Sequence, residues 1–168
     1  MTPDPRPPLA FDPIEAAAAQ WAARYDQMPR MRAVTSLMRV HQLVLTELDE
    51  LLRGSGLTFA RYEVLVLLSF SRRGALPLGK IGERLQVHAT SVTPLVKRLE
   101  AAGLIQRTPH PEDGRAVLAS ITPRGREVLT EATEAIVAAQ FALSSMDEAH
   151  CDELTRLLTE PRAAAGDF

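Results

Sequence analysis

The chain has 168 residues, a length typical of one domain of ordinary size. Hydrophobic residues make up 46% and charged residues 24% of the chain, which excludes a protein that is disordered throughout. Arginines and acids interrupt every apolar run before the roughly 20 residues that a membrane-spanning helix needs. The single cysteine, Cys151, can form no internal disulfide, which favours a cytoplasmic protein.

The net charge of −2 conceals an uneven distribution along the chain. Residues 58–125 contain ten basic and five acidic side chains, a balance of +5, which leaves −7 for the flanking segments. A basic central region between acidic ends is expected when one part of a protein faces a polyanion. A chance fluctuation on a solvated surface would give the same numbers, so charge alone does not separate the two interpretations.

Hydrophobic periodicity and capping residues predict a mainly helical chain. Residues 1–13 hold five prolines and two acids, so we expect a flexible arm and no secretory signal. Thr58 and Thr122 are expected N-caps, and Pro161 is expected to end the last helix. In that helix Leu154, Leu157 and Leu158 are expected to face inward. The predicted helices cover residues 14–26, 31–53, 60–71, 78–85, 89–102, 123–143 and 147–160.

The pattern changes from helical to alternating after Gly103. Residues 104–108 and 116–121 are predicted strands around a turn at 109–114. Two short helices joined by a tight turn at 86–88 and followed by a β-hairpin form a winged helix-turn-helix. The expected fold class is therefore mainly α with a small β-hairpin.

The second short helix carries the features expected of a DNA-contacting element. If Val92, Val96 and Leu99 anchor this helix to the core, its opposite face is polar, and a helix of its width fits the major groove. Pro94 is expected near the helix start, where a missing N–H costs least. At the hairpin tip, Asp113 beside Arg115 would suit an arginine held for the minor groove, although an ordinary solvated turn is the alternative. The polar face comprises Thr90, Ser91, Thr93, Lys97 and Arg98.

The segment from 57 to 129 resembles the MarR family of bacterial transcription regulators. The resemblance is carried by "SVTPLVKRLEAAGLIQR", the wing "DGR" and "SITPRGREVL". It implies a homodimer with two winged domains on a pseudo-palindromic DNA operator, and repression relieved by a small ligand. By position, Ser91, Thr93 and Lys97 match major-groove contacts, and Asp113 orients the minor-groove Arg115. Arg98 and Arg107 complete the expected DNA-binding set.

The resemblance also has departures. Many members carry two arginines at the wing tip, whereas Arg115 stands alone here. The pair Thr93–Pro94 is similar to a peroxide-sensing branch, but that branch uses a cysteine in its first helices, and the only cysteine here is Cys151. We therefore expect Cys151 to be a packing residue.

In this family ligands occupy a cleft between the dimer helices and the winged domain. An aromatic acid could be held there by flat apolar walls and a cation. His41 interrupts an apolar helical stripe, and either a ligand role or a hydrogen-bonded position in the core or the dimer interface would account for it. The usual burial of aromatic residues favours the alternative that they belong to the core. The candidate ligand residues are Trp21, Met38, His41, Tyr62, Phe70 and Arg72.

Two other interpretations remain open. The segment Gly74–Lys80 fits the GxxxxGK pattern of a nucleotide-binding loop, and the apolar run 64–70 could be the strand before it. However, Ile81 stands where a Ser or Thr would bind magnesium, and no other catalytic or metal-ligating motif occurs, so we expect no enzyme, no cofactor and no metal. The second alternative is a winged-helix protein that binds DNA without sensing a ligand, or one that only bridges other proteins.

These inferences predict five segments. Residues 1–13 form a flexible arm, 14–56 dimerisation helices and 57–122 the DNA-binding domain. Residues 123–160 form further dimerisation helices, and 161–168 a flexible tail.

Overall fold

The computed structural model describes residues 9–110, 113 and 116–168. The chain forms two compact units, residues 1–45 and 46–168. The boundary falls inside one long helix, α2 (Met28–Leu52), which begins in the first unit and ends in the second. None of the helices in the described part of the chain is both long and apolar enough to cross a bilayer.

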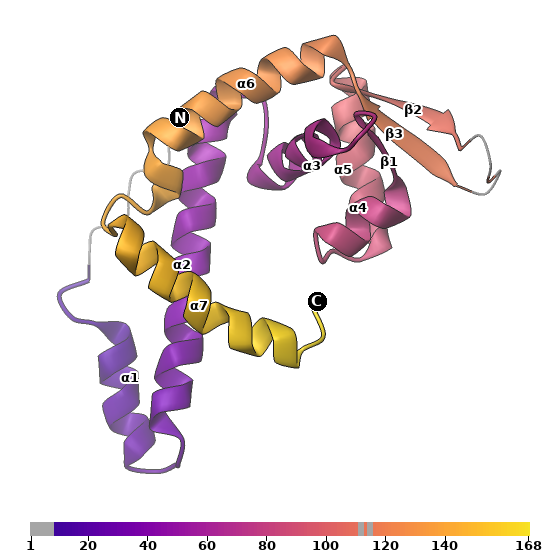
Figure 1. Ribbon diagram of the computed structural model, residues 1–168. Coiled ribbons are helices and arrows are strands. Elements are labelled where there is room, and N and C mark those ends of the chain that lie inside the picture. The colour runs from indigo at the N-terminus through magenta and orange to yellow at the C-terminus, as the bar shows by residue number, and fades with distance from the viewer. Residues whose placement is uncertain (1–8, 111–112, 114–115) are drawn as a thin grey trace. The chain divides into compact units, whose positions relative to one another are not determined.

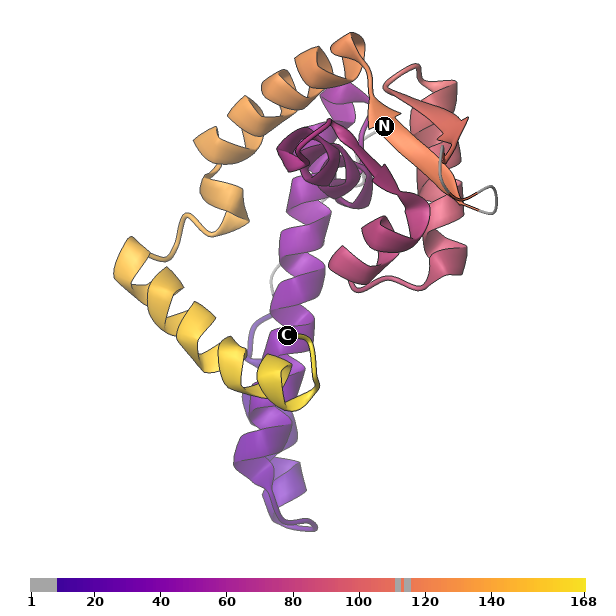
Figure 2. The same cartoon turned by 45° about the vertical axis from the view of Figure 1, so that its right-hand side comes forward.

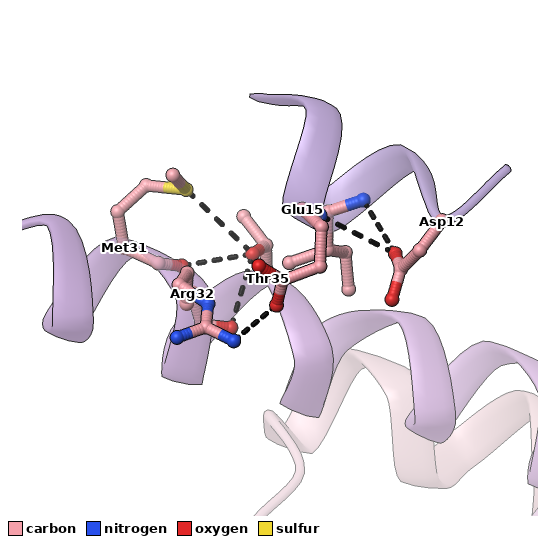
Figure 3. A network of polar contacts seen from close by, with 6 residues as sticks. Asp12, Glu15, Met31, Arg32 and Thr35 are labelled. Atoms are coloured by element: carbon pink, nitrogen blue, oxygen red, sulfur yellow. Dashed lines mark hydrogen bonds and ion pairs between the residues drawn. The ribbon is translucent and has the colours of Figure 1, made fainter. Parts of the chain in front are cut away.

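The first unit contains α1 (Pro13–Ala22) and most of α2. The Asp12 carboxylate caps α1 by accepting hydrogen bonds from the first backbone N–H groups of the helix. Arg32 of α2 forms an ion pair with Glu15 of α1, as Figure 3 shows. Helix α2 begins at Met28 rather than at the predicted residue 31, because Pro29 in the first turn removes no helical hydrogen bond.

The second unit confirms a mainly helical fold with a small sheet. The run 64–70, for which a strand was an alternative, is helical and forms most of α3. The elements after α2 are η1 (Arg53–Ser55), α3 (Phe59–Phe70), β1 (Ala75–Pro77), α4 (Leu78–Arg84), α5 (Ala89–Ala101), β2 (Ile105–Pro109), β3 (Val117–Ile121), α6 (Pro123–Ala138), η2 (Gln140–Ala142) and α7 (Glu148–Ala164).

We call residues 57–136 the winged-helix body. Its interior is apolar and closed, because large side chains from α3, α4 and α5 meet in one core with those of β3 and α6. Gly125 allows α6 to approach this core closely, since a Cβ at that position would overlap the carbonyl oxygen of Leu104. The fully buried large side chains of the body are Val64, Leu65, Leu68, Ile81, Val92, Val96, Leu99 and Ile136.

The sheet has three antiparallel strands in the order β1–β3–β2. The predicted hairpin is β2–β3, in which Ile105 pairs with Ile121 and Pro109 with Val117. The hairpin extends away from the helices beside α5 (Figures 1 and 2). Strand β1 was not predicted, because it has three residues and ends in Pro77, which only an edge strand accommodates easily.

Three predicted features of α6 and α7 differ from the structure. Helix α6 ends at Ala138 rather than near Leu143, because the backbone turns left-handed over 140–142 without a glycine to mark the break. Helix α7 continues through Pro161 to Ala164, since the alanines and arginine that follow are good helix formers. Within α7, Leu157 is exposed, and no residue of the helix is fully buried.

The N-cap prediction succeeds at one threonine and is incomplete at the other. The Thr122 side chain accepts a hydrogen bond from the backbone N–H of Gly125, as expected. Thr58 occupies the N-cap position of α3, but its side chain makes no capping bond. The Asp49 carboxylate accepts the N–H of Phe59 instead, at 2.6 Å. A capping group 10 residues away in the sequence leaves no local motif.

Candidate nucleic-acid interface

Helices α4 and α5 form the predicted helix-turn-helix, joined by residues 85–88. The N–H of Val87 donates to the carbonyl of Gly82, and Gln86 adopts a left-handed conformation with φ of 55°. A Cβ on Gly82 would lie 3.0 Å from the Val87 carbonyl oxygen and 3.1 Å from a Val92 methyl group. The glycine therefore permits the close packing of α5 on α4.

Helix α5 is amphipathic, with its apolar and polar faces where the sequence predicts them. Val92, Val96 and Leu99 are buried against the rest of the winged-helix body. Their burial turns the opposite face to solvent, so α5 presents hydroxyl groups in its first half and cations in its second. The exposed predicted residues of α5 are Thr90, Ser91, Thr93, Lys97 and Arg98.

His88 positions the first of these hydroxyls and was not anticipated. It is the N-cap residue of α5, and its Nδ1 accepts the backbone N–H of Thr90 at 3.3 Å. The same nitrogen lies 2.8 Å from Thr90 Oγ1. Histidine is not among the usual N-cap residues, so sequence patterns gave no signal for this contact.

Pro94 lies deeper in α5 than expected. Because the helix begins at Ala89, Pro94 is its sixth residue and lies beyond the first turn. It cannot donate to the carbonyl of Thr90 four residues earlier. Thr90 lies on the exposed face, so water or a bound partner can satisfy this carbonyl oxygen.

Helices α4 and α5 carry four cations, of which Lys80 alone forms an ion pair with a described residue; the others are Arg84 on α4 and Lys97 and Arg98 on α5. On α4, Lys80 forms an ion pair with Glu83 at 2.7 Å, and its hydrogen bond holds the pKa of the Glu83 carboxyl below the usual range. On α5, neither Lys97 nor Arg98 has an ion-pair partner within the residues that the structure describes. Lys97 and Arg98 lie on the same exposed face of α5 as the hydroxyls.

The structure describes only part of the wing, which is the β2–β3 hairpin with the turn that joins its strands. Arg107 of β2, an expected DNA contact, is half-buried and forms an ion pair with Glu100 of α5. Asp113 is exposed, and its backbone carbonyl accepts the N–H of Ala116 at 2.9 Å. Arg115, the expected minor-groove residue, lies outside the described residues.

A cavity of about 560 Å³ lies between α3 and α6. Its wall is mostly apolar, with a hydrogen bond of 3.2 Å between Tyr62 Oη and Thr133 Oγ1. Arg126 and Glu134 bring one charge of each sign to it. The residues that line the cavity are Tyr62, Val66, Ser69, Phe70, Arg126, Leu129, Thr130, Thr133, Glu134 and Val137.

The cavity brings together two of the six candidate ligand residues, Tyr62 and Phe70. Arg72 is exposed and does not line it, and Arg126 supplies a cation there instead. Arg126 lies one helical turn before Leu129 and Thr130 on α6, so the three residues share a helix face. This spacing could have identified Arg126 only if the position of the cavity had been known.

The remaining three candidates belong to the first compact unit. Trp21 donates its indole N–H to the Asp26 carbonyl at 2.8 Å, and its ring centroid lies 4.9 Å from that of Tyr25. Met38 and His41 are exposed on α2, so neither is a core residue within that unit.

The structure excludes a nucleotide-binding loop at Gly74–Lys80. The strand that such a loop requires before it is helix α3, and the loop itself contains β1 and the start of α4. Over the described ranges, no three His, Cys, Asp or Glu side chains cluster closely enough to hold a metal ion.

Comparison with known proteins gives consistent matches to one family. The MarR family model matches residues 57–117. The HTH-type transcriptional repressor MdtR of Bacillus subtilis is 34% identical over 90 residues, which cover 54% of this chain and 57% of MdtR. The organic hydroperoxide resistance transcriptional regulator of the same organism is 32% identical over 103 residues, which cover 61% of this chain and 69% of that protein.

A solved structure extends the match over more of the chain. Sco5413, a MarR family transcriptional regulator from Streptomyces coelicolor, is 51% identical, with a TM-score of 0.79. The match covers 83% of this chain and 97% of Sco5413. The chain therefore spans little more than half of MdtR but nearly all of Sco5413.

Proposed function

Since this chain belongs to the MarR family, we propose that it is a sequence-specific, DNA-binding transcriptional regulator. Helix α5 enters the major groove, which is about 12 Å wide and admits a helix about 10–12 Å across. The hydroxyls of Thr90, Ser91 and Thr93 contact base edges, and Lys97 and Arg98 contact phosphates. Asp113 orients Arg115 toward the minor groove.

The observation that carries this proposal is the exposed face of α5. A surface helix that served only to cover the core would gain from pairing its charges, as α4 does with Lys80 and Glu83. Lys97 and Arg98 instead lie unpaired among the described residues, beside exposed hydroxyls. Such a face suits a polyanion whose phosphates supply the missing negative charge.

The regulator acts as a homodimer. The supporting observation is the number of large apolar side chains exposed on the flanking helices, a pattern typical of unfilled interfaces. Helix α2 exposes Val34, Leu37 and Met38, and α7 exposes Leu157. We assign residues 14–56 and 123–160 to dimerisation, with α7 continuing to Ala164. A twofold pair of bodies would meet two DNA half-sites about one helical turn apart.

The regulator is a repressor that a small aromatic acid releases from DNA. The cavity between α3 and α6 supports this part of the proposal, because Tyr62 and Phe70 offer flat apolar walls and Arg126 a cation for a carboxylate. Its volume of about 560 Å³ lies within the range of small-molecule sites. The similarity to MdtR, which is named a repressor, supports the sign of regulation.

DNA binding is tested by selecting duplexes from a random pool with the purified protein, then footprinting the DNA upstream of its gene. We expect a protected pseudo-palindrome whose binding weakens steeply with salt. A protein that ignores duplexes of every sequence at modest salt would overturn the proposal.

Ligand release is tested by titrating benzoate and hydroxybenzoates against the protein–DNA complex. We expect release by at least one acid, lost in Arg126→Ala and kept in Arg124→Ala, which removes an exposed arginine of the same helix outside the cavity. If no acid of this panel releases the protein, the alternative of a regulator without this ligand class is favoured.

A further inference from the structure

Helix α5 and the β2–β3 hairpin of the wing are joined by an ion pair between Glu100 and Arg107. Arg107 Nε and Nη2 both lie 2.6 Å from Glu100 Oε2. The two side chains are 34% and 30% exposed, so they are partly shielded from water. Among the described residues, this is the only ion pair that connects α5 to the sheet.

The position of the pair lets it act on the geometry of the wing. Between α5 and β2 the chain turns at Gly103, where φ is 73°. The backbone N–H of Leu104 donates to the Leu99 carbonyl at 3.0 Å. Two residues into β2, Arg107 lies opposite Ala119 of β3 and is drawn back onto the last turn of α5 by Glu100. The start of the hairpin is therefore held to α5 by backbone and side chains together.

The pair places an acidic side chain on the helix that is proposed to bind DNA, where electrostatics alone would favour only basic and neutral residues. Glu100 is the only acidic residue of α5. An acid on a helix that meets phosphates weakens binding by repulsion, so neutralising it should strengthen binding if charge were its only effect. If Glu100 instead supports the structure that binds DNA, neutralising it should weaken binding.

We propose that Glu100 and Arg107 are positioning residues that fix the wing relative to α5, so that one subunit contacts the major and the adjacent minor groove together. This inference rests on the proposed function and assigns Arg107 a partner in the protein in place of direct contact with DNA. The energetic reason is preorganisation: a wing that is already oriented loses less conformational freedom when it binds.

The test compares the wild-type protein with Glu100→Gln on a duplex that the wild type has selected from a random pool. We expect Glu100→Gln to bind this duplex several-fold more weakly although it removes a negative charge. Glu83→Gln is the matched control, because Glu83 carries the same charge but pairs only within α4. We expect Glu83→Gln to bind equally well or more tightly.

Coupling to the wing tip distinguishes positioning from general damage to the fold. In the wild type, Arg115→Ala should weaken binding several-fold, and in the Glu100→Gln background the same change should matter much less. The exchange of both residues, Glu100→Arg with Arg107→Glu, should recover part of the lost affinity. Far-UV circular dichroism and thermal unfolding show whether each variant is folded.

The outcomes separate this inference from the proposed function. If the wild type binds no duplex, the proposed function fails. If the wild type binds and Glu100→Gln binds as tightly or more tightly, with an unchanged effect of Arg115→Ala, the positioning role is wrong and the proposed function stands.

Discussion

The winged-helix body buries most of its large apolar side chains, whereas the helices that flank it expose several of theirs. In the body, Leu68 and Ile81 have no exposed surface. On α2, Val34 and Met38 are each 56% exposed, and on α7 Leu157 is 53% exposed. The body has a closed core and exposes Phe70, at 85%, at the end of α3, whereas the flanking helices expose several apolar side chains that a single chain leaves in contact with water.

This difference indicates a division of labour. A closed core makes the body rigid, so α5 and the hairpin keep a fixed geometry for DNA. Open apolar faces are the expected state of dimerisation helices seen in one chain. The proposed regulator therefore combines a self-sufficient DNA-binding body with helices that need a second copy, and each prediction below tests one side of that comparison.

The largest expected effect is on the core of the body. Leu68→Ala should lower the free energy of unfolding by about 2–5 kcal/mol, because it leaves a cavity in a closed interior. Leu9→Ala removes the same atoms from an exposed position and should change stability little. Chemical denaturation of both variants gives the comparison, and similar losses at the two sites would refute the closed-core account.

A charge on the flanking helices should disrupt dimerisation instead. Leu37→Glu on α2 should convert the dimer to a single subunit and weaken operator binding about 100-fold, because the gain from binding two half-sites at once is lost. Arg39→Ala changes the net charge by the same amount at another exposed position of α2. Sedimentation velocity should find only Leu37→Glu monomeric, and a dimeric Leu37→Glu would argue against an interface on this face.

The exposed face of α5 gives a smaller effect. Lys97→Ala should weaken DNA binding several-fold and reduce the salt dependence of the logarithm of the binding constant by about 1, because one phosphate contact is removed. Lys80→Ala, in which the lost cation is already paired with Glu83, should change neither quantity much. Fluorescence anisotropy at several salt concentrations measures both, and equal effects of the two variants would contradict the assignment of α5.

The smallest effect concerns Glu63 of α3. Burial raises the pKa of the Glu63 carboxyl above its ordinary value of 4.5. The Glu63 carboxyl therefore binds its proton more tightly in the folded state than in the unfolded state. Ionised Glu63 lowers the free energy of unfolding, and this loss is absent well below pH 4.5 and complete above the raised pKa. Glu63→Gln should raise Tm slightly at pH 7 and not at low pH. A difference from the wild type that does not depend on pH would show that Glu63 carries no such cost.

The sequence predicted the features that depend on residues close together in the chain. The amphipathic face of α5, the β2–β3 hairpin and the Thr122 cap all follow from short-range periodicity and capping chemistry. Other features depend on groups that are distant in the sequence. The cap from Asp49 to Phe59 and the pair of Glu100 with Arg107 leave no local pattern, and Arg126 joins Tyr62 and Phe70 only because α3 packs against α6.

The points where helices end or continue could not be predicted for a different reason. Helix α6 stops before three left-handed residues, Gln140, Phe141 and Ala142, none of which is a usual left-handed residue. Conversely, the prolines at 94 and 161 usually interrupt a helix, yet α5 and α7 continue through them. Around Pro94 the buried side chains of Val92 and Val96 hold α5 to the core, and after Pro161 the helix-forming residues 162–164 continue α7.

The most direct test of the account is the mass of the protein–DNA complex at about 0.15 M salt, measured by light scattering on the selected duplex. We expect two chains on each duplex, with both halves of the pseudo-palindrome protected. One chain on each duplex, or no complex at this salt concentration, would contradict it.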